Sequence, residues 1–101
     1  MKAPSILVVG ETPSLGRSVT DLLDSWSLPV EYVEDPGGKA PLENFAGRHP
    51  VVVVACNSYF CETGRRWARG ELPKVALVVV GSRDPLVLAD RRICSMPLPL
   101  E

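Results

Sequence analysis

Three cysteines are the side chains best suited to covalent chemistry in this sequence of 101 residues. Cys56 and Cys61 are five residues apart, and Cys94 is distant from both. A thiol enzyme needs a base beside its cysteine, but the only histidine, His49, precedes Cys56 by seven residues. On one strand this spacing separates the two side chains by about 23 Å, which excludes a Cys–His dyad. We therefore expect buried free thiols, with a redox role for Cys56 and Cys61 as an alternative.

Metal binding is not predicted from these cysteines. A zinc site needs about four good ligands, and the cysteine spacings provide no such set. An odd number of cysteines without a dense framework is typical of a reducing compartment rather than of a disulfide-bonded secreted domain. We therefore expect no metal, no other cofactor and a cytoplasmic location.

The segment from Gly10 to Ser18 is a near match to a phosphate-binding loop. That loop has four residues between its first glycine and its Gly-Lys-Ser/Thr, whereas five residues separate Gly10 from Gly16, and Arg17 replaces the lysine. Pro13 also removes one of the backbone N–H groups that must surround a phosphate. We interpret the segment as a strand-to-helix turn, and keep small-molecule or nucleotide-phosphate binding there as an alternative.

A group of arginines is a candidate surface for an acidic partner. Three of them fall on one short predicted helix, where Arg65 and Arg69 are four residues apart and repel each other slightly. A solvated helix face explains the same pattern and is the simpler interpretation. The candidate surface consists of Arg65, Arg66, Arg69, Arg91 and Arg92.

Short apolar segments, which alternate with helical or loop segments, must position these side chains. Ile6–Val9 is apolar throughout and ends at Gly10, as is typical of a strand buried on both faces of a parallel sheet. Thr12 and Pro13 then form the N-cap and first-turn pair of a helix whose apolar stripe includes Trp26. Strands are predicted over residues 6–9, 30–34, 51–55, 75–80 and 93–98, and helices over 13–26, 40–48, 62–70 and 85–90.

This alternation predicts one α/β domain over residues 1–101. Its parallel sheet is expected to be doubly wound, with helices on both faces. Trp26 and Trp67 each fall on the apolar side of a predicted helix. We therefore expect both to pack within the domain rather than to stack on a ligand.

The order of these motifs resembles the response-regulator receiver family. A buried strand is followed by an acidic residue and by Pro13-Ser14-Leu15 at the start of a helix, and the strand from Pro50 resembles the one that ends at the family's phosphoacceptor aspartate. Met96-Pro97 falls where the family has a Lys-Pro pair. The resemblance covers almost the whole chain. It implies a flavodoxin-like, five-stranded sheet of order 2-1-3-4-5, with its pocket at the carboxyl ends of the first and third strands.

The chain differs from this family at almost every position of the phosphorylation site. Gly10 replaces the first acidic residue, Cys56 replaces the phosphoacceptor aspartate and Met96 replaces the lysine. One remaining carboxylate does not form a Mg²⁺ site, and neither a cysteine nor an asparagine forms an acyl phosphate. The resemblance therefore implies a degenerate pocket. Its residues are Gly10, Glu11, Cys56, Asn57, Gly81, Ser82 and Met96.

Two helices of the receiver fold are expected to be reduced. Little room remains for a fourth helix between Gly81 and Ile93, and the sequence ends within five residues of Met96, without a fifth. We expect a sheet face near the first and fifth strands to be uncovered, which is typical of an interface. The final Leu100-Glu101 is compatible with an added cloning sequence, in which case the natural protein continues past this end.

These observations predict a non-catalytic pseudo-receiver, a signalling or regulatory module related to two-component systems that is not phosphorylated on the usual aspartate. Its uncovered face is expected to bind a protein partner or a second copy of the chain. A net charge of −1 argues against nucleic-acid binding. No apolar stretch approaches the ~20 residues of a membrane helix. Phosphate binding at Gly10–Gly16 and thiol redox chemistry at Cys56 and Cys61 are the alternatives.

Overall fold

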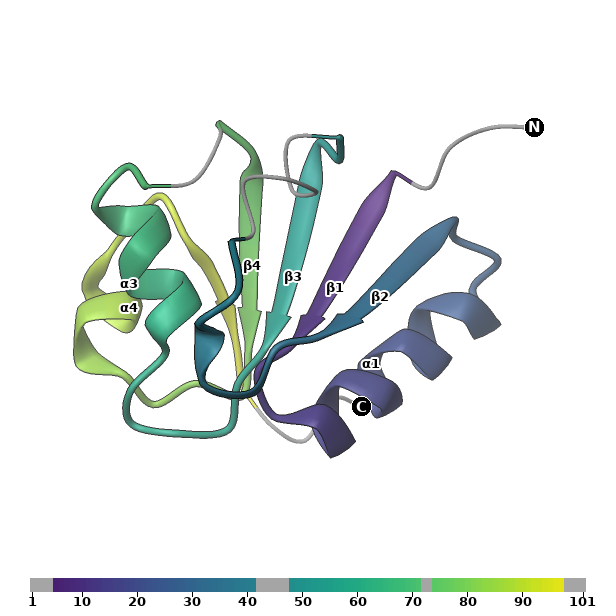
Figure 1. Cartoon of the computed structure of the whole chain (residues 1–101), viewed down its shortest axis with the longest axis horizontal. Helices are drawn as coiled ribbons and strands as arrows, with labels where there is room; N and C mark the ends of the chain where they lie inside the picture. The colour runs from purple at the N-terminus through teal and green to yellow at the C-terminus, as the bar shows by residue number, and fades with distance from the viewer. Residues whose placement is uncertain (1–4, 42–47, 72–73, 98–101) are drawn as a thin grey trace.

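The computed structural model describes residues 5–41, 48–71 and 74–97. It has an α/β fold whose five strands form one all-parallel sheet of order β2-β1-β3-β4-β5 (Figure 1). This arrangement confirms the predicted fold class and strand order. The strands are β1 (Ile6–Gly10), β2 (Val30–Glu34), β3 (Val51–Ala55), β4 (Ala76–Val80) and β5 (Cys94–Met96). The helices of the described residues are α1 (Pro13–Ser25), the 3₁₀ turn η1 (Pro36–Gly38), α3 (Glu62–Ala68) and α4 (Pro85–Ala89).

Alternate residues of the strands point to opposite faces of the sheet, and both faces contribute to the core. On one face, Leu7 and Val9 pack in a cluster that includes Val87 of α4 and the ring of Trp67 from α3. On the other face, Val8 packs in a cluster that includes Val19 of α1. Strand β1 is therefore apolar throughout, because its residues Leu7–Val9 are buried on both faces of the sheet and only Ile6 is half-buried.

Several predicted elements differ from the observed ones at their ends, most of them by one or two residues. The fourth helix is reduced to the five residues of α4, as expected, and α3 ends at Ala68 rather than at residue 70. The last strand covers only Cys94–Met96. Most of the helix predicted over residues 40–48 lies outside the described residues.

Tyr32 explains why glycine occupies both Gly10 and Gly16. Its ring lies against both residues, and its hydroxyl donates a hydrogen bond to the carbonyl oxygen of Pro13 at 3.2 Å. A Cβ at Gly16 would lie 2.7 Å from the Cα of Gly10. Helix α1 can therefore approach β1 closely only because both positions lack a side chain.

The substitution Gly16→Ala tests this close approach. Alanine in a helix is ordinarily more stable than glycine by up to about 1 kcal/mol. Here the added methyl group meets backbone atoms of β1, and overpacking of this kind costs roughly 1–3 kcal/mol. We expect a net decrease in the free energy of unfolding, measured by urea denaturation. Ser18→Ala on the exposed side of the same helix is the control, and a Gly16→Ala protein as stable as wild type would contradict the explanation.

Candidate functional site

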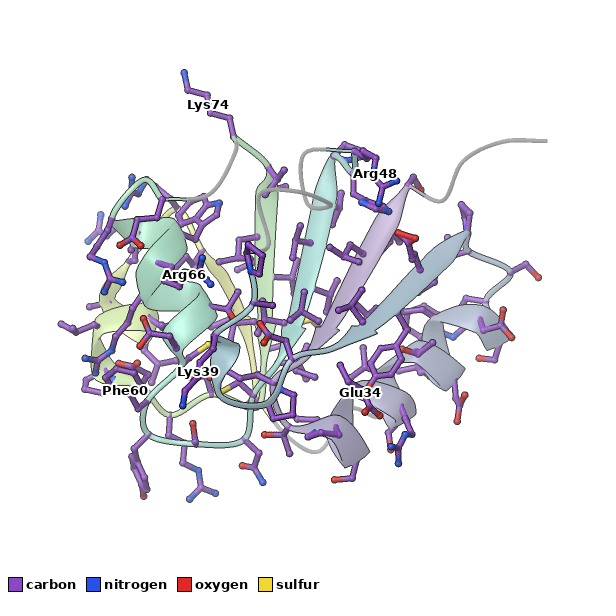
Figure 2. All side chains as sticks on the ribbon, in the orientation of Figure 1. Glu34, Lys39, Arg48, Phe60, Arg66 and Lys74 are labelled. Carbon is purple, nitrogen blue, oxygen red and sulfur yellow. The ribbon has the colours of Figure 1, made fainter. Side chains whose placement is uncertain are left out.

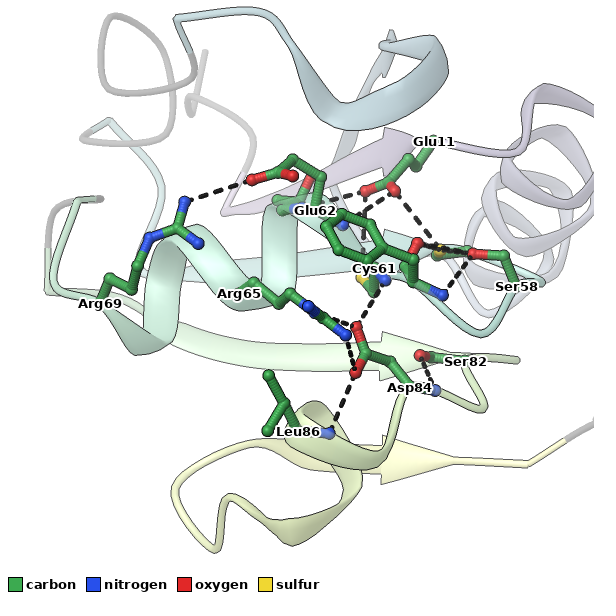
Figure 3. A network of polar contacts seen from close by, with 12 residues as sticks. Glu11, Ser58, Cys61, Glu62, Arg65, Arg69, Ser82, Asp84 and Leu86 are labelled. Atoms are coloured by element: carbon green, nitrogen blue, oxygen red, sulfur yellow. Dashed lines mark hydrogen bonds and ion pairs between the residues drawn. The ribbon is translucent and has the colours of Figure 1, made fainter.

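The carboxyl edge of the sheet brings together a carboxylate and two thiols. Glu11 follows β1, Cys56 follows the neighbouring strand β3, and Cys61 immediately precedes α3. The Cys56 thiol donates to Glu11 Oε1 with a sulfur–oxygen distance of 3.5 Å, and the Cys61 thiol donates to Glu11 Oε2 at 3.9 Å (Figure 3). One ligand atom from each of the three residues lies within 4.8 Å of the other two. The topological switch point between β1 and β3 is thus occupied by Glu11, Cys56 and Cys61, which we call the thiol–carboxylate cluster.

Backbone groups of α3 hold the Glu11 carboxylate in place. Its Oε1 accepts a hydrogen bond from the N–H of Glu62, and its Oε2 accepts one from the N–H of Thr63, both at 3.1 Å. These are two of the N–H groups that a helix leaves unpaired in its first turn. Glu11 therefore joins the end of β1 to the start of α3, although about fifty residues separate them in the sequence.

The two thiols of the cluster are buried and differ in acidity. Cys56 is 1% exposed and Cys61 is fully buried. Contact with Cys61 lowers the pKa of Cys56, and Ser58 acts in the same direction against the opposing effects of burial and of Glu11. Contact with Cys56, together with burial, raises the pKa of Cys61. Cys56 is therefore the more acidic thiol of the pair. His49 does not belong to this cluster, because it precedes β3 and its Nε2 lies 3.1 Å from Glu31 Oε1.

An ion pair between the buried Asp84 and the partly exposed Arg65 lies beside the cluster. Asp84 Oδ2 accepts from Arg65 Nε at 2.7 Å and from the N–H of Cys61 at 2.8 Å (Figure 3). Asp84 Oδ1 accepts from Arg65 Nη2 and from the N–H of Leu86, both at 3.0 Å. Sequence reasoning missed this residue, although Asp84 before Pro85 is a recognisable signal for a helix N-cap. Asp84 connects the starts of α3 and α4.

Most of the candidate arginine surface is engaged within the fold. Besides Arg65, Arg66, whose side chain is labelled in Figure 2, donates to the carbonyl oxygens of Gly38 and Ala40. Arg69 pairs with Glu62 and Glu71, and Arg92 contacts Asp90 and the ring of Trp67. These four side chains thus have structural partners, and the acidic-partner surface, including Arg91, stays a prediction.

The residues predicted for the degenerate pocket are only partly brought together. Thr12 occupies the N-cap position of α1, where the sequence predicted a capping hydrogen bond. Its hydroxyl instead accepts a hydrogen bond from the N–H of Asn57 at 3.1 Å and does not cap the helix. Ser82 accepts from the N–H of Asp84 at 3.1 Å. The N–H of Gly81 donates to the carbonyl oxygen of Met96 across the edge of the sheet. The chemistry-bearing part of the pocket is therefore the thiol–carboxylate cluster.

The turn between Gly10 and Gly16 is filled by protein atoms. The ring of Tyr32 lies against both glycines, and the N–H of Thr12 donates to the carbonyl oxygen of Ala55 at 2.9 Å. That N–H group is therefore directed into the fold. Packing against Tyr32 therefore explains both glycines without a bound phosphate, and phosphate binding at this turn is not proposed.

An apolar groove lies beside α1, on the face of the sheet opposite to α3 and α4. Its volume is about 260 Å³. Trp26 is 60% exposed beside it and Met96 is 43% exposed. Trp26 was predicted to pack inside the domain, which is wrong, because no described helix covers this part of the sheet. The groove lining consists of Val19, Leu22, Leu23, Trp26, Val53, Val78, Val80 and Met96.

The groove agrees with the predicted uncovered surface at the fifth strand but not at the first. Open apolar surface was expected near both strands, whereas α1 packs over β1, β2 and β3. The groove instead extends over parts of β3, β4 and β5. Within the described residues, no helix is long and apolar enough to cross a membrane.

Comparisons of the chain with protein-family models, with curated proteins and with solved structures found no match. The resemblance to receivers therefore remains a proposal, although the sheet has the strand order that it implies. Two features of the molecule remain as candidate sites: the buried thiol–carboxylate cluster and the apolar groove.

The pKa of Asp84 leads to a prediction about stability. Burial alone would raise this pKa, but the hydrogen bonds from Arg65, Cys61 and Leu86 outweigh burial and hold it below its usual value. A carboxyl group whose pKa is lower in the folded state stabilises the protein above its unfolded pKa of about 3.9. That contribution is lost as the pH falls from this value through the folded pKa.

We expect Asp84→Asn to lower the free energy of unfolding at pH 7 by roughly 1.5 kcal/mol, the lower limit for a hydrogen bond to a charged group. The lower limit applies because Arg65 is partly exposed. In urea denaturation, the difference from wild type should shrink as the pH falls below about 4. Glu34→Gln is the control, since the exposed Glu34–Arg17 pair contributes little. A difference that is independent of pH would contradict the role of the Asp84 charge.

Proposed function

We propose that this chain is a non-catalytic, receiver-like regulatory module that acts through protein–protein contact, with the apolar groove as its contact surface. The exposure of Trp26 and Met96 over an apolar part of the sheet carries this proposal. Apolar surface of this kind on a small domain is typical of an interaction site. Tryptophan and methionine are also enriched where proteins bind one another.

The occupant that best fits the groove is an amphipathic helix of a partner protein. A parallel sheet is ordinarily covered by helices on both faces, and among the described residues no helix covers β4 and β5 on the face that carries α1. A helix beside α1 would place its apolar stripe on Val78 and Val80 of β4. Its polar side would face solvent, as in other helix-in-groove complexes.

The chemistry of the pocket supports a role without phosphorylation. Of the receiver carboxylates only Glu11 is present, and both of its oxygens already accept backbone N–H groups. The residue after β3 is the buried Cys56. Among the described residues, the pocket at the carboxyl edge contains no carboxylate that is free to accept a phosphoryl group. We further propose that the module acts in cytoplasmic signalling of the two-component kind.

Treatment with acetyl phosphate and Mg²⁺ tests the absence of phosphorylation. We expect the intact mass of the protein to stay unchanged, because no nucleophilic carboxylate lies at the end of β3. A parallel incubation without Mg²⁺ is the control for non-specific modification. A gain of one phosphoryl group that depends on Mg²⁺ and is removed by hydroxylamine would show an acyl phosphate and overturn this part of the proposal.

Photo-cross-linking in the cells that make the protein tests the groove. A photoreactive phenylalanine analogue replaces either Trp26 in the groove or Tyr59, which is 70% exposed and lies outside the groove lining. We expect one dominant adduct from position 26 and none of that mass from position 59. Mass spectrometry of the adduct should place the cross-link on the apolar face of a helix in another protein.

Two outcomes of the cross-linking experiment would change the conclusion. Equal yields from positions 26 and 59, or no adduct from position 26, would overturn the groove as the contact surface. An adduct with twice the mass of the chain would assign the groove to a second copy rather than to a different protein. The variant Trp26→Glu should abolish the association in either case, since it places a charge in an apolar interface at a position too exposed to matter for folding.

A further inference from the structure

We propose that Glu11, Cys56 and Cys61 form a binding site for a thiophilic divalent cation of the zinc class. The thiol–carboxylate cluster lies at the carboxyl edge of the sheet, whereas the groove lies beside α1 on one face. The inference is therefore independent of the proposed function. It differs from the expectation of no metal, which considered only the spacing of the cysteines.

The distances within the cluster fit tetrahedral coordination. Zinc lies about 2.3 Å from a thiolate sulfur and about 2.0–2.2 Å from a carboxylate oxygen. Tetrahedral angles then separate sulfur from oxygen by about 3.5 Å, and sulfur from sulfur by about 3.8 Å. Cys56 Sγ lies 3.5 Å from Glu11 Oε1, Cys61 Sγ lies 3.9 Å from Glu11 Oε2, and one ligand atom from each residue lies within 4.8 Å of the other two. Coordination through a single oxygen would therefore draw the three ligand atoms together by up to about 1 Å.

Neighbouring groups already orient these ligands, as the outer partners of metal sites do. The N–H groups of Glu62 and Thr63 fix the two Glu11 oxygens, and the lone pairs that now accept the two thiols become available to a cation once the thiols lose their protons. The hydroxyl of Ser58 lies 3.1 Å from Cys56 Sγ. The cluster is therefore built on the end of β1, the end of β3 and the start of α3, and its geometry does not depend on a single segment.

The buried hydroxyl of Thr63 is a second feature that points to a ligand beside the thiol–carboxylate cluster. Thr63 is fully buried, and its Oγ1 has no hydrogen-bond partner among the described residues. A Cβ at Gly38 would lie 2.9 Å from both this hydroxyl and Glu11 Oε2, so the two oxygens border the same space. A buried hydroxyl without a partner is costly. Water in the fourth coordination position would provide one.

The ligand set selects the class of cation. Two thiolates favour zinc-class ions over Mg²⁺, which requires oxygen ligands in octahedral geometry. Binding replaces both S–H bonds with metal–sulfur bonds and releases the two protons to solvent. Three protein ligands also leave one position for water or another ligand, as in zinc sites that are not purely structural.

Titration of the fully reduced protein with Co²⁺ tests the site, because Co²⁺ substitutes for Zn²⁺ and is coloured. We expect one equivalent of Co²⁺ to produce a thiolate-to-cobalt charge-transfer band and the visible bands of tetrahedral cobalt. Zn²⁺ should abolish both, and excess Mg²⁺ should abolish neither. Cys56→Ser and Cys61→Ser should each weaken binding by at least about a hundredfold, the upper limit for loss of an outer partner alone.

The exposed Cys94 supplies the matched control, since it lies on β5 and outside the cluster. Cys94→Ser should bind Co²⁺ as wild type does. Glu11→Gln should weaken binding at least about tenfold, and the cysteine variants remain informative if loss of the cap on α3 unfolds that protein. Absence of the charge-transfer band from the reduced wild type overturns the proposal. So does a band that survives in Cys56→Ser and Cys61→Ser but is lost in Cys94→Ser.

Discussion

The carboxylate of Glu11 links the end of β1 to the end of β3 and the start of α3, which lie about fifty residues later in the sequence. Glu11 directly follows β1, and its carboxylate accepts hydrogen bonds from two backbone N–H groups in the first turn of α3. It also accepts hydrogen bonds from the thiols of Cys56, after β3, and Cys61, before α3. This contact exists because parallel strands in register end at one edge, where Gly10 lies beside Ala55. A carboxylate at that edge satisfies groups that would otherwise be buried without partners.

The two faces of the sheet are completed in different ways. On one face, α3 and α4 are joined through the buried Asp84–Arg65 pair, and the ring of Phe60 lies 3.9 Å from the Arg65 guanidinium. On the other face, α1 is held close to β1 by the absence of side chains at Gly10 and Gly16. The first face is closed, and the second leaves the groove over β3, β4 and β5. The same fold therefore separates a buried polar centre from an exposed apolar surface.

Much of the fold was predictable because the local signals are strong. Continuous apolar segments such as Val51–Ala55 indicated buried parallel strands, and Pro13 marked the start of a helix. Trp26 was misjudged, since helical periodicity places it on the apolar stripe but does not show what lies opposite that stripe. Asp84 was overlooked, although its position before Pro85 is a local signal for a cap.

The sequence by itself determined the α/β pattern and indicated the burial of Cys56 and Cys61, although not the exposure of Cys94, because the first two follow from residue types and short-range periodicity. Only the tertiary structure decided that Glu11 meets Cys56 and Cys61, since that contact depends on which strands are neighbours and on their register. It also decided that most of the candidate arginines are used within the fold. Contacts between residues about fifty positions apart are set by packing of the whole chain, which the spacing of a few cysteines does not encode.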